Sequence, residues 1–439
     1  MLLKLMDGIT QFRQVLDALG RRFAMPIFAA GLAGPHRAML AAAAAGHTGK
    51  PILFITPDEV SAVRAAEDLN RLLGEGAALV YPERDYNFRS AEGASAEYEH
   101  QRLAVLGSIL SGTCRAVTAS AEAALQYTIP PGTYAHNTIV LKKGASEDLT
   151  KLAARFVRAG YERRDEVDGI CQFSIRGGIL DFYSPQAAAP TRAEFWGDEI
   201  DSLAHFDIES QRRTRELDSA VIAPAREVLP DSMEQLRAVL LEQKILQKGK
   251  QGVAVKKQLD ADLTRLETGL SVSAPDRYLP LIYKFPATLF DYFEGATVFV
   301  SEFIRQKEIL KTLANQWNMD LTMLYEEGVL FPGCDKFSLD FEEYCEQLEN
   351  SDTVLMDVFL RTSQELPIRT VVDFAGIQLS LWSGELALLL DDVRDYLLRE
   401  YTVVILAGTE RGAKALASDL AANGIEAICA DDAFVKKGQ

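Results

Sequence analysis

Short apolar runs alternate with amphipathic segments along the first 130 residues. Apolar runs at 26–30 and 51–56 each precede a helical pattern, which consists of strong helix formers, mostly alanine, at 36–45 and of apolar residues three or four positions apart at 58–73. The runs are typical of buried strands and the spaced segments of helices. This alternation predicts an α/β domain with a parallel sheet, preceded by a helix at 8–24.

The pattern changes after the Pro130-Pro131-Gly132 turn. Residues 146–160 predict an amphipathic helix that Ser146 caps and Gly160 ends. Strand patterns separated by glycine and proline turns follow at 170–176, 178–183, 192–196 and 200–206. We therefore expect a small α+β domain with an antiparallel sheet over 133–211.

The remaining chain predicts two further units. Residues 212–345 are mostly helical in pattern, and we expect them to complete the first domain, which begins with residues 1–132. Within 212–345, the Lys- and Gly-rich stretch 247–257 predicts a solvated loop or a helix-hairpin tip. Residues 346–439 predict another small α/β domain, with strands at 402–407 and 425–429 and a helix at 410–423 that Thr409 caps. The fold class is thus α/β, with a small α+β domain inserted into a parallel-sheet domain.

Composition narrows the functional classes. Of 439 residues, 48% are hydrophobic and 25% charged, as in ordinary globular proteins. The net charge of −17 argues against a general nucleic-acid binder, although it leaves room for a local basic surface. The five cysteines form no CxxC pair and the histidines are scattered, so we expect no metal site and a cytoplasmic location. Because no long apolar run occurs, we expect neither a signal peptide nor a membrane span.

A phosphate-binding loop motif stands in the correct place but lacks its chemistry. The motif GxxxxGK[ST] follows a strand and opens a helix, and here Gly31 and Gly34 keep part of the loop. His36 replaces the second motif glycine, Arg37 the lysine and Ala38 the magnesium-binding hydroxyl. Three chemical roles are lost together, so we expect no ATP hydrolysis and no cofactor at this degenerate nucleotide site.

Two neighbouring patterns do not restore that chemistry. In nucleotide-binding proteins of this kind, a second strand ends in acidic residues that help to bind magnesium. The predicted strand 296–301 is followed by Glu302, but Ser301 stands where the first of these acidic residues would be, so we expect no metal coordination. The Gly49-Lys50 pair follows a helix and precedes a strand, which is the reverse of the order that phosphate binding requires.

These motifs together resemble a known family. The degenerate loop is followed by the sequences IRGGILDFY at 175–183 and RAEFWGDEIDS at 192–202. Over about residues 10–439 the chain is similar to the UvrB-like portion of bacterial transcription-repair coupling factors (Mfd). The related protein UvrB carries an intact phosphate-binding loop and a long aromatic hairpin for damaged DNA, whereas the matching segment 81–100 here is too short for that hairpin.

The resemblance implies that the small domain binds the nucleotide-excision-repair ATPase UvrA, as UvrB does. The matching positions are Arg176, Arg192 and Trp196, where the family often has phenylalanine at the last. Arg192, Glu194 and Trp196 share one strand face, and Arg and Trp are common interface anchors. The alternative is structural: Arg192 and Glu194 pair across strands, and Trp196 closes the edge of the core.

The family also implies domains that are not visible in this sequence. They bind RNA polymerase and double-stranded DNA, and ATP and magnesium are expected only for their translocase motor. We therefore expect a non-enzymatic part of a longer protein, which recruits UvrA and restrains that motor. The alternative is an ATP-dependent helicase or damage-verification subunit of the UvrB type.

Overall fold

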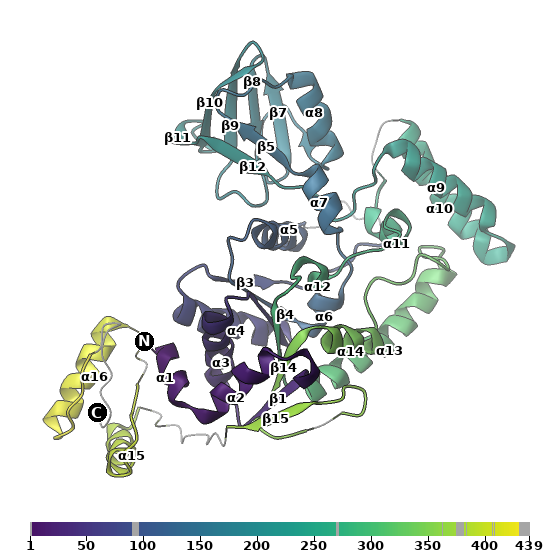
Figure 1. Cartoon of the computed structure of the whole chain (residues 1–439). Coiled ribbons are helices and arrows are strands. Elements are labelled where there is room, and N and C mark those ends of the chain that lie inside the picture. Colours follow the sequence, from purple (N-terminus) through teal and green to yellow (C-terminus); the bar gives the residue numbers. More distant parts are fainter. Residues whose placement is uncertain are drawn as a thin grey trace.

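A large parallel sheet forms the centre of the molecule. The computed structural model describes residues 2–89, 96–268, 272–361, 363–374, 382, 384–405, 407 and 409–429. Seven strands run in the order β15-β1-β14-β13-β2-β4-β3 (Figure 1). They are β1 (Ile27–Ala30), β2 (Ile52–Thr56), β3 (Ala78–Tyr81), β4 (Ala116–Ser120), β13 (Thr297–Ser301), β14 (Asp352–Met356) and β15 (Thr370–Asp373). All neighbouring pairs are parallel, which confirms the predicted α/β class.

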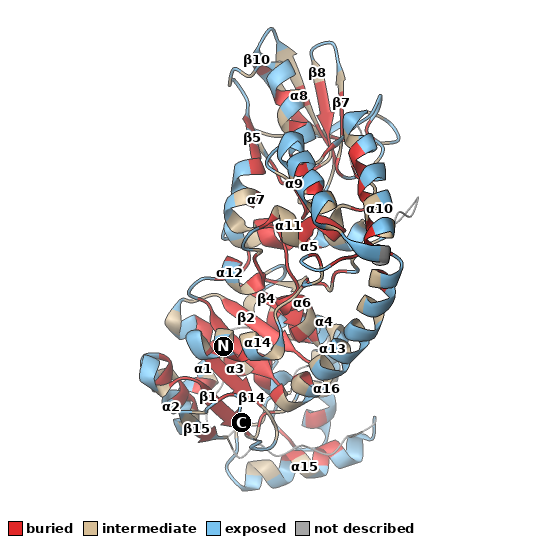
Figure 2. Cartoon of the chain, turned by 90° about the vertical axis from the view of Figure 1, so that its right-hand side faces the viewer, coloured by how far each residue is buried: buried red, intermediate tan, exposed pale blue. Residues whose placement is uncertain are grey.

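Helices cover both faces of this sheet, because its strands bury side chains on both. Leu53 and Ile55 of β2 belong to one core, and Ile52 and Phe54 to the other. Figure 2 shows the buried residues concentrated along the strands. The core of Ile52 and Phe54 packs against α2 (Thr10–Leu19), α3 (Pro35–Thr48) and α4 (Glu59–Leu73). The core of Leu53 and Ile55 packs against α5 (Glu97–Leu110), α6 (Ala121–Leu125), α12 (Leu289–Tyr292), α13 (Phe303–Glu326) and α14 (Phe341–Asn350). Shorter helices are α1 (Leu2–Leu5), η1 (Met6–Gly8), η2 (Arg22–Ala24), α7 (Pro131–Asn137), η3 (Pro275–Tyr278) and α11 (Leu279–Ile282).

The sheet is assembled from distant parts of the chain. Strands β14 and β15 lie beyond the predicted boundary at 346, yet β14 pairs with β1 and β13, and β15 with β1. That boundary therefore falls inside the first domain. The pattern of a buried strand does not say which sheet it joins, since strand pairing is decided by tertiary contacts.

The inserted domain is a six-stranded sheet with one covering helix. Its strand order is β11-β10-β9-β8-β7-β6, and β5 pairs separately with β12. The elements are β5 (Ile139–Lys142), α8 (Leu149–Arg158), β6 (Glu162–Arg163), β7 (Gln172–Arg176), β8 (Ile179–Phe182), β9 (Thr191–Trp196), β10 (Glu199–Phe206), β11 (Arg213–Glu216) and β12 (Ser219–Ile222). The four predicted strands are confirmed as β7 to β10, and the β6–β7 pair is parallel within an otherwise antiparallel sheet.

Two details of this domain differ from the sequence expectation. Strands β11 and β12 follow the predicted end at 211 and pair with β10 and β5, so the unit extends further. The α8 N-cap is Asp148 rather than Ser146: its carboxylate accepts from the N–H groups of Thr150 and Lys151. Both residue types cap helices, and a carboxylate also suits the positive helix end.

Two helical units complete the chain. Helices α9 (Met233–Leu246) and α10 (Gly249–Glu267) form a hairpin, so residues 249–257 are helical and the connection is only 247–248. At the C-terminal end, α15 (Leu386–Leu398) and α16 (Glu410–Ala422) pack together, and Thr409 caps α16 as predicted. The described residues 402–405 and 425–429 are not in strands; Val403, Ile405 and Ile425 pack against the two helices instead. No helix within the described ranges is both long enough and apolar enough to cross a membrane.

A buried ion cluster joins the inserted domain to the large sheet. Glu227, on the segment returning from β12, accepts from Arg102 of α5 at 2.8 Å and from Arg84, which follows β3, at 3.0 Å. Arg84 also pairs with Asp276 of η3 at 2.6 Å. Burial alone would raise the pKa of Glu227, but the charges of Arg102 and Arg84 outweigh it, so this pKa lies below its ordinary value. The cluster ties four sequence-distant segments together.

Breaking this cluster should destabilise the protein strongly. Glu227→Gln leaves the buried Arg102 without its carboxylate, and an uncompensated buried charge costs about 3–5 kcal/mol. Urea unfolding followed by tryptophan fluorescence and circular dichroism should show the loss. The exposed pair Arg213–Glu194 provides the control: Arg213→Gln should cost below about 1 kcal/mol. Equal costs for the two variants would contradict the role given to Glu227.

Three carboxylates gather at the carboxyl edge of the sheet. Glu59 opens α4, Glu83 follows β3 and Glu122 lies in α6, after β4. Burial raises the pKa of Glu122 to about 7, and the nearby charges of Glu83 and Glu59 add to the shift. Glu83 accepts a hydrogen bond of 2.6 Å from the Ser120 hydroxyl, which holds it in place.

This raised pKa makes stability depend on pH. The folded protein holds the Glu122 proton up to a pH of about 7, whereas the ordinary pKa is 4.5. The folded state thus binds more protons in this interval, and the free energy of unfolding should fall as pH rises through it. Unfolding midpoints at a series of pH values should show a smaller fall for Glu122→Gln. Glu326→Gln, at an exposed position of α13, should retain the wild-type slope.

Candidate functional site

The uncovered face of the six-stranded sheet carries a row of charged residues. Helix α8 buries Leu152 and Phe156 against Phe173 and Phe182 on the opposite face. Because side chains alternate along a strand, the remaining positions point away from α8. They include Arg176 on β7, Asp181 on β8, and Arg192, Glu194 and Trp196 on β9. We name these five residues the docking face.

Asp181 holds the two arginines of the docking face. Its Oδ1 accepts from Arg192 Nε at 2.6 Å, and its Oδ2 accepts from Arg192 Nη2 at 2.8 Å and from Arg176 Nη2 at 2.9 Å. Only 1% of Asp181 is exposed. The pairing of β8 with β9 sets Asp181 directly opposite Arg192, so the sheet register fixes this arrangement. A bidentate pair of this kind is strong and geometrically specific.

Arg192 is engaged almost entirely within the domain. Its Nη1 donates to the Gln211 carbonyl at 3.2 Å, its Nη2 to Gln211 Oε1 at 2.8 Å, and its guanidinium lies 4.6 Å from the centre of the Phe206 ring. The hydrogen bond with Asp181 raises the pKa of Arg192. Its side chain is 14% exposed. Arg192 thus pairs across strands with Asp181 of β8, and Glu194 with Arg213 of β11, as the structural alternative described.

Arg176 and Trp196 are the accessible members of the face. The Arg176 side chain is 42% exposed and also pairs with Glu166 at 2.8 Å. Trp196 is 84% exposed and precedes Gly197, whose φ of 64° lets the chain turn into β10. A tryptophan this exposed does not close the edge of the core, and large exposed aromatic side chains are typical of contact surfaces.

Sequence reasoning missed three residues that organise this face. Asp181 lies within the quoted motif, but only the strand register reveals that it serves both arginines. Gln211, at a φ of 57°, reaches Arg192 from the loop before β11. Arg213 pairs with Glu194, and the hydrogen bond from Arg213 lowers the pKa of that carboxylate. Alternation along β8 was the one sequence signal that could have indicated Asp181.

The degenerate phosphate-binding loop lies between β1 and α3, as the sequence predicted. Gly31 and Gly34 have φ values of 80° and 47°, and the exposed His36 lies in the first turn of α3. The N–H of Gly31 donates to the Val358 carbonyl at 3.1 Å, and that of Leu32 to Asp357 at 3.1 Å. These two backbone donors, which a phosphate would need, are therefore taken by the chain itself.

Arg37 is turned into the protein at the lysine position of the motif. Its Nε donates to the Leu32 carbonyl at 3.0 Å, and its Nη1 to Ser301 Oγ and Glu302 Oε1, each at 2.6 Å. Burial disfavours the ionised Glu302, but the hydrogen bond and charge of Arg37 outweigh it and lower the pKa. The structure thus brings Arg37, Ser301 and Glu302 together, and the buried Ala38 adds no ligand atom.

The aromatic residues of segment 81–89 are internal rather than displayed. Tyr86 and Phe88 stack with ring centres 5.7 Å apart, and both rings pack against Phe337. Trp317 of α13 completes the group. Tyr86, Phe88 and Trp317 are thus partly buried against one another and Phe337, rather than displayed as free rings.

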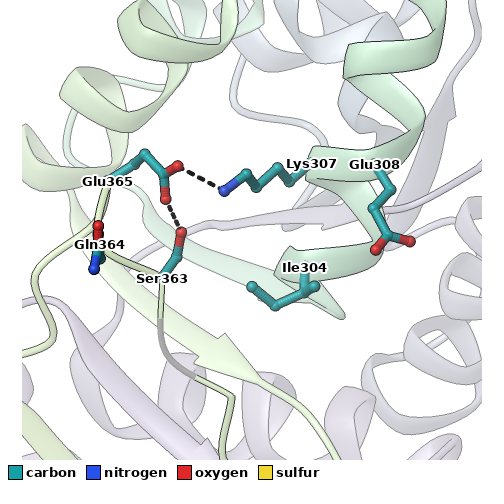
Figure 3. Close-up of a pocket in the computed structure, with 6 residues that line it drawn as sticks. All are labelled: Ile304, Lys307, Glu308, Ser363, Gln364 and Glu365. Atoms are coloured by element: carbon teal, nitrogen blue, oxygen red, sulfur yellow. Dashed lines mark hydrogen bonds and ion pairs between the residues drawn. The ribbon is translucent and has the colours of Figure 1, made fainter.

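A shallow pocket lies where α13 faces the segment after β14. Figure 3 shows Ile304, Lys307 and Glu308 on the helix side, and Ser363, Gln364 and Glu365 opposite. Lys307 Nζ donates to Glu365 at 2.6 Å, and this bond, with one from Ser363, lowers the pKa of Glu365 to about 2. Lys307, the positively charged residue that lines this pocket, is already paired with Glu365, so we assign no ligand to the pocket. No metal-binding group of three His, Cys, Asp or Glu residues occurs among the described residues.

Comparisons with known proteins place both the inserted domain and the whole chain beside known relatives. Residues 139–228, which span β5 to the segment after β12, match the model of the UvrB interaction domain family. The transcription-repair-coupling factor of Bacillus subtilis is 28% identical over 428 residues, covering 96% of this chain and 36% of that protein. Its counterpart in Staphylococcus haemolyticus is 22% identical over 98% of this chain, and that in Haemophilus influenzae 27% identical over 64%.

The chain spans about a third of the length of the curated relatives that it matches over nearly its whole extent. The matches cover the large sheet, the inserted domain and the C-terminal helices together. This chain is therefore similar over nearly its whole length to the bacterial transcription-repair-coupling factors, and its residues 139–228 match the UvrB interaction domain family.

Proposed function

We propose that this chain is the recruitment part of a DNA-repair factor and that it binds UvrA through the docking face, in the way that UvrB does. The observation that carries the proposal is Trp196, an 84% exposed tryptophan on the same sheet face as an ordered arginine pair, inside a domain matched to the UvrB interaction family. Tryptophan and arginine lead the residues that dominate protein interfaces.

The three predicted contact residues have different parts in this proposal. Trp196 and Arg176 reach the partner directly, because both side chains are accessible. Arg192 acts mainly by shaping the face, since Asp181, Gln211 and Phe206 already engage its guanidinium. Such an arrangement is preorganised, which lowers the entropy lost on binding.

We propose further that this part of the protein does not turn over ATP. Arg37 and the N–H groups of Gly31 and Leu32 already have partners within the chain, so a nucleotide would have to displace them. The same proposal assigns binding to RNA polymerase and movement along double-stranded DNA to regions of the relatives outside the third that this chain matches. Restraint of that motor by this chain is part of the same proposal.

Binding to UvrA tests the recruitment proposal. In calorimetry with the whole chain, Trp196→Ala should lower affinity by about 2 kcal/mol or roughly thirtyfold, and Arg176→Ala should also weaken binding. The thermal unfolding midpoint should change little for both. Phe285→Ala removes another aromatic residue, 79% exposed and outside the docking face, and should bind like wild type. Full affinity of the Trp196 variant would overturn the assigned surface.

Arg192→Ala should behave differently from these two variants. It removes a guanidinium that Asp181 and Gln211 hold, so it should lower both the unfolding midpoint of the small domain and the affinity for UvrA. Circular dichroism melting and calorimetry on the same sample separate the two effects. An Arg192 variant with an unchanged midpoint and weak binding would mean that Arg192 contacts the partner directly.

A nucleotide titration tests the non-catalytic proposal. Fluorescent ATP with magnesium should show no saturable binding in the micromolar range, because Arg37 is held by Glu302 and Ser301. Arg37→Lys should not restore binding, since Ala38 still lacks the hydroxyl for magnesium. Micromolar affinity in the wild type would instead favour an ATP-dependent helicase subunit of the UvrB type.

A further inference from the structure

The strongest unexplained feature outside the docking face is the end of the α9–α10 hairpin. From 243 to 259 the sequence has no acidic residue, in a chain whose net charge is −17. The same stretch contains the lysines Lys244, Lys248, Lys250, Lys256 and Lys257. Figure 1 shows α9 and α10 side by side, extending from the edge of the molecule. We name residues 243–257 the basic hairpin end.

Of the lysines of the basic hairpin end whose side chains the structure describes, Lys244 is paired with a carboxylate and Lys248, Lys256 and Lys257 are not. Arg237 of α9 pairs with Glu267 of α10, and Lys244 of α9 with Asp260 of α10. Within the described part of the chain, Lys248, Lys256 and Lys257 have no carboxylate within 4 Å. Lys248 and Lys257 are exposed and Lys256 is half-buried. The start of α10 carries neither an acidic residue nor a side-chain cap that would offset their charge.

The hairpin itself holds this charge in a fixed position. Leu236 and Leu240 of α9 pack against Val255 and Leu259 of α10, in a core that also includes Phe331. Gly328, after α13, approaches so closely that an added Cβ would lie 2.6 Å from the Ala254 side chain. The lysines thus stand on a braced helical pair, and a rigid site loses less entropy on binding than a mobile tail.

We propose that the basic hairpin end binds the phosphate backbone of double-stranded DNA, independently of sequence. The inference rests on the proposed function in a DNA-repair factor, and it adds a DNA contact within this chain itself. Duplex DNA carries one negative charge for about every 1.7 Å of its axis, which is the complement of clustered unpaired lysines. Lysine contacts phosphates as a point charge and reads no base pattern without further side chains.

The composition of the hairpin distinguishes duplex DNA from other anionic partners. Helices α9 and α10 contain no aromatic residue, so they offer no platform on which the bases of a single strand could stack. They also lack the aromatic anchors typical of helices that lie on membranes. The exposed aliphatic side chains at this end, Ile245, Leu246 and Val253, are able to pack against the sugar faces that line the phosphates.

The test is fluorescence anisotropy of a labelled duplex with the whole chain. At about 50 mM salt we expect measurable binding, which about 200 mM salt should weaken roughly fortyfold if three phosphates are neutralised. The triple variant Lys248→Glu/Lys256→Glu/Lys257→Glu should lose at least about tenfold in affinity and most of the salt dependence. The control variant Lys142→Glu/Lys143→Glu/Lys151→Glu makes the same change of charge at exposed positions of the small domain. It should bind the duplex at least threefold more tightly than the hairpin variant does.

Further measurements separate this inference from the recruitment proposal. The hairpin variant should keep its unfolding midpoint and its affinity for UvrA, while Trp196→Ala should keep its affinity for DNA. Absence of duplex binding by the wild type, or equal binding by the hairpin variant, would overturn the inference and leave UvrA recruitment untouched. Tighter binding to single-stranded DNA, to RNA or to vesicles containing phosphatidylserine would also overturn it.

Discussion

The buried contact of Glu227 with Arg102 and Arg84 is the constraint on which the arrangement of the molecule depends. The chain leaves the large sheet after β4, builds an entire second domain and returns through Glu227, whose carboxylate accepts from Arg102 and Arg84 of the first domain. The Glu227 side chain has no exposed surface, and burying an unpaired carboxylate costs much free energy. The contact with the arginines therefore selects one position for the returning segment. Gly107 of α5 supports it, because the Gln186 side chain of the inserted domain occupies the space that a Cβ would need.

Internal pairing of charges has opposite consequences at the two places where the sequence suggested function. At the loop after β1, Arg37 is satisfied by Glu302, Ser301 and the Leu32 carbonyl, so the position that would meet phosphate is occupied from within. On the docking face, Asp181 satisfies Arg192 and steadies Arg176, but it leaves Trp196 and much of Arg176 in solvent. The first arrangement uses its arginine within the chain, whereas the second leaves two large side chains accessible to solvent.

Charge is also divided unevenly over the molecule. Three carboxylates gather at the carboxyl edge of the large sheet, where burial and mutual repulsion hold the pKa of Glu122 near neutrality. The lysines at the hairpin end, by contrast, lie in a stretch free of acidic residues. Exposed charges separated by more than a Debye length of about 8–10 Å are largely screened from one another. The distant carboxylates therefore do not cancel the lysines, and a strongly acidic chain can carry one local surface suited to a polyanion. Net charge alone does not decide which partners such a protein binds.

The sequence by itself determined the local elements and the chemistry that was missing. Periodicity located β1, β2, α3, α4 and β7 to β10, and the substitutions at His36, Arg37 and Ala38 were visible without coordinates. Sequence also brought forward Arg176, Arg192 and Trp196, but through a family motif rather than through their surroundings. Only the tertiary structure placed β14 and β15 in the first sheet, gave both arginines to Asp181 and assigned Arg192 an internal role. The physical reason is that periodicity records which way a side chain points, whereas strand pairing and burial depend on contacts between residues far apart in the chain.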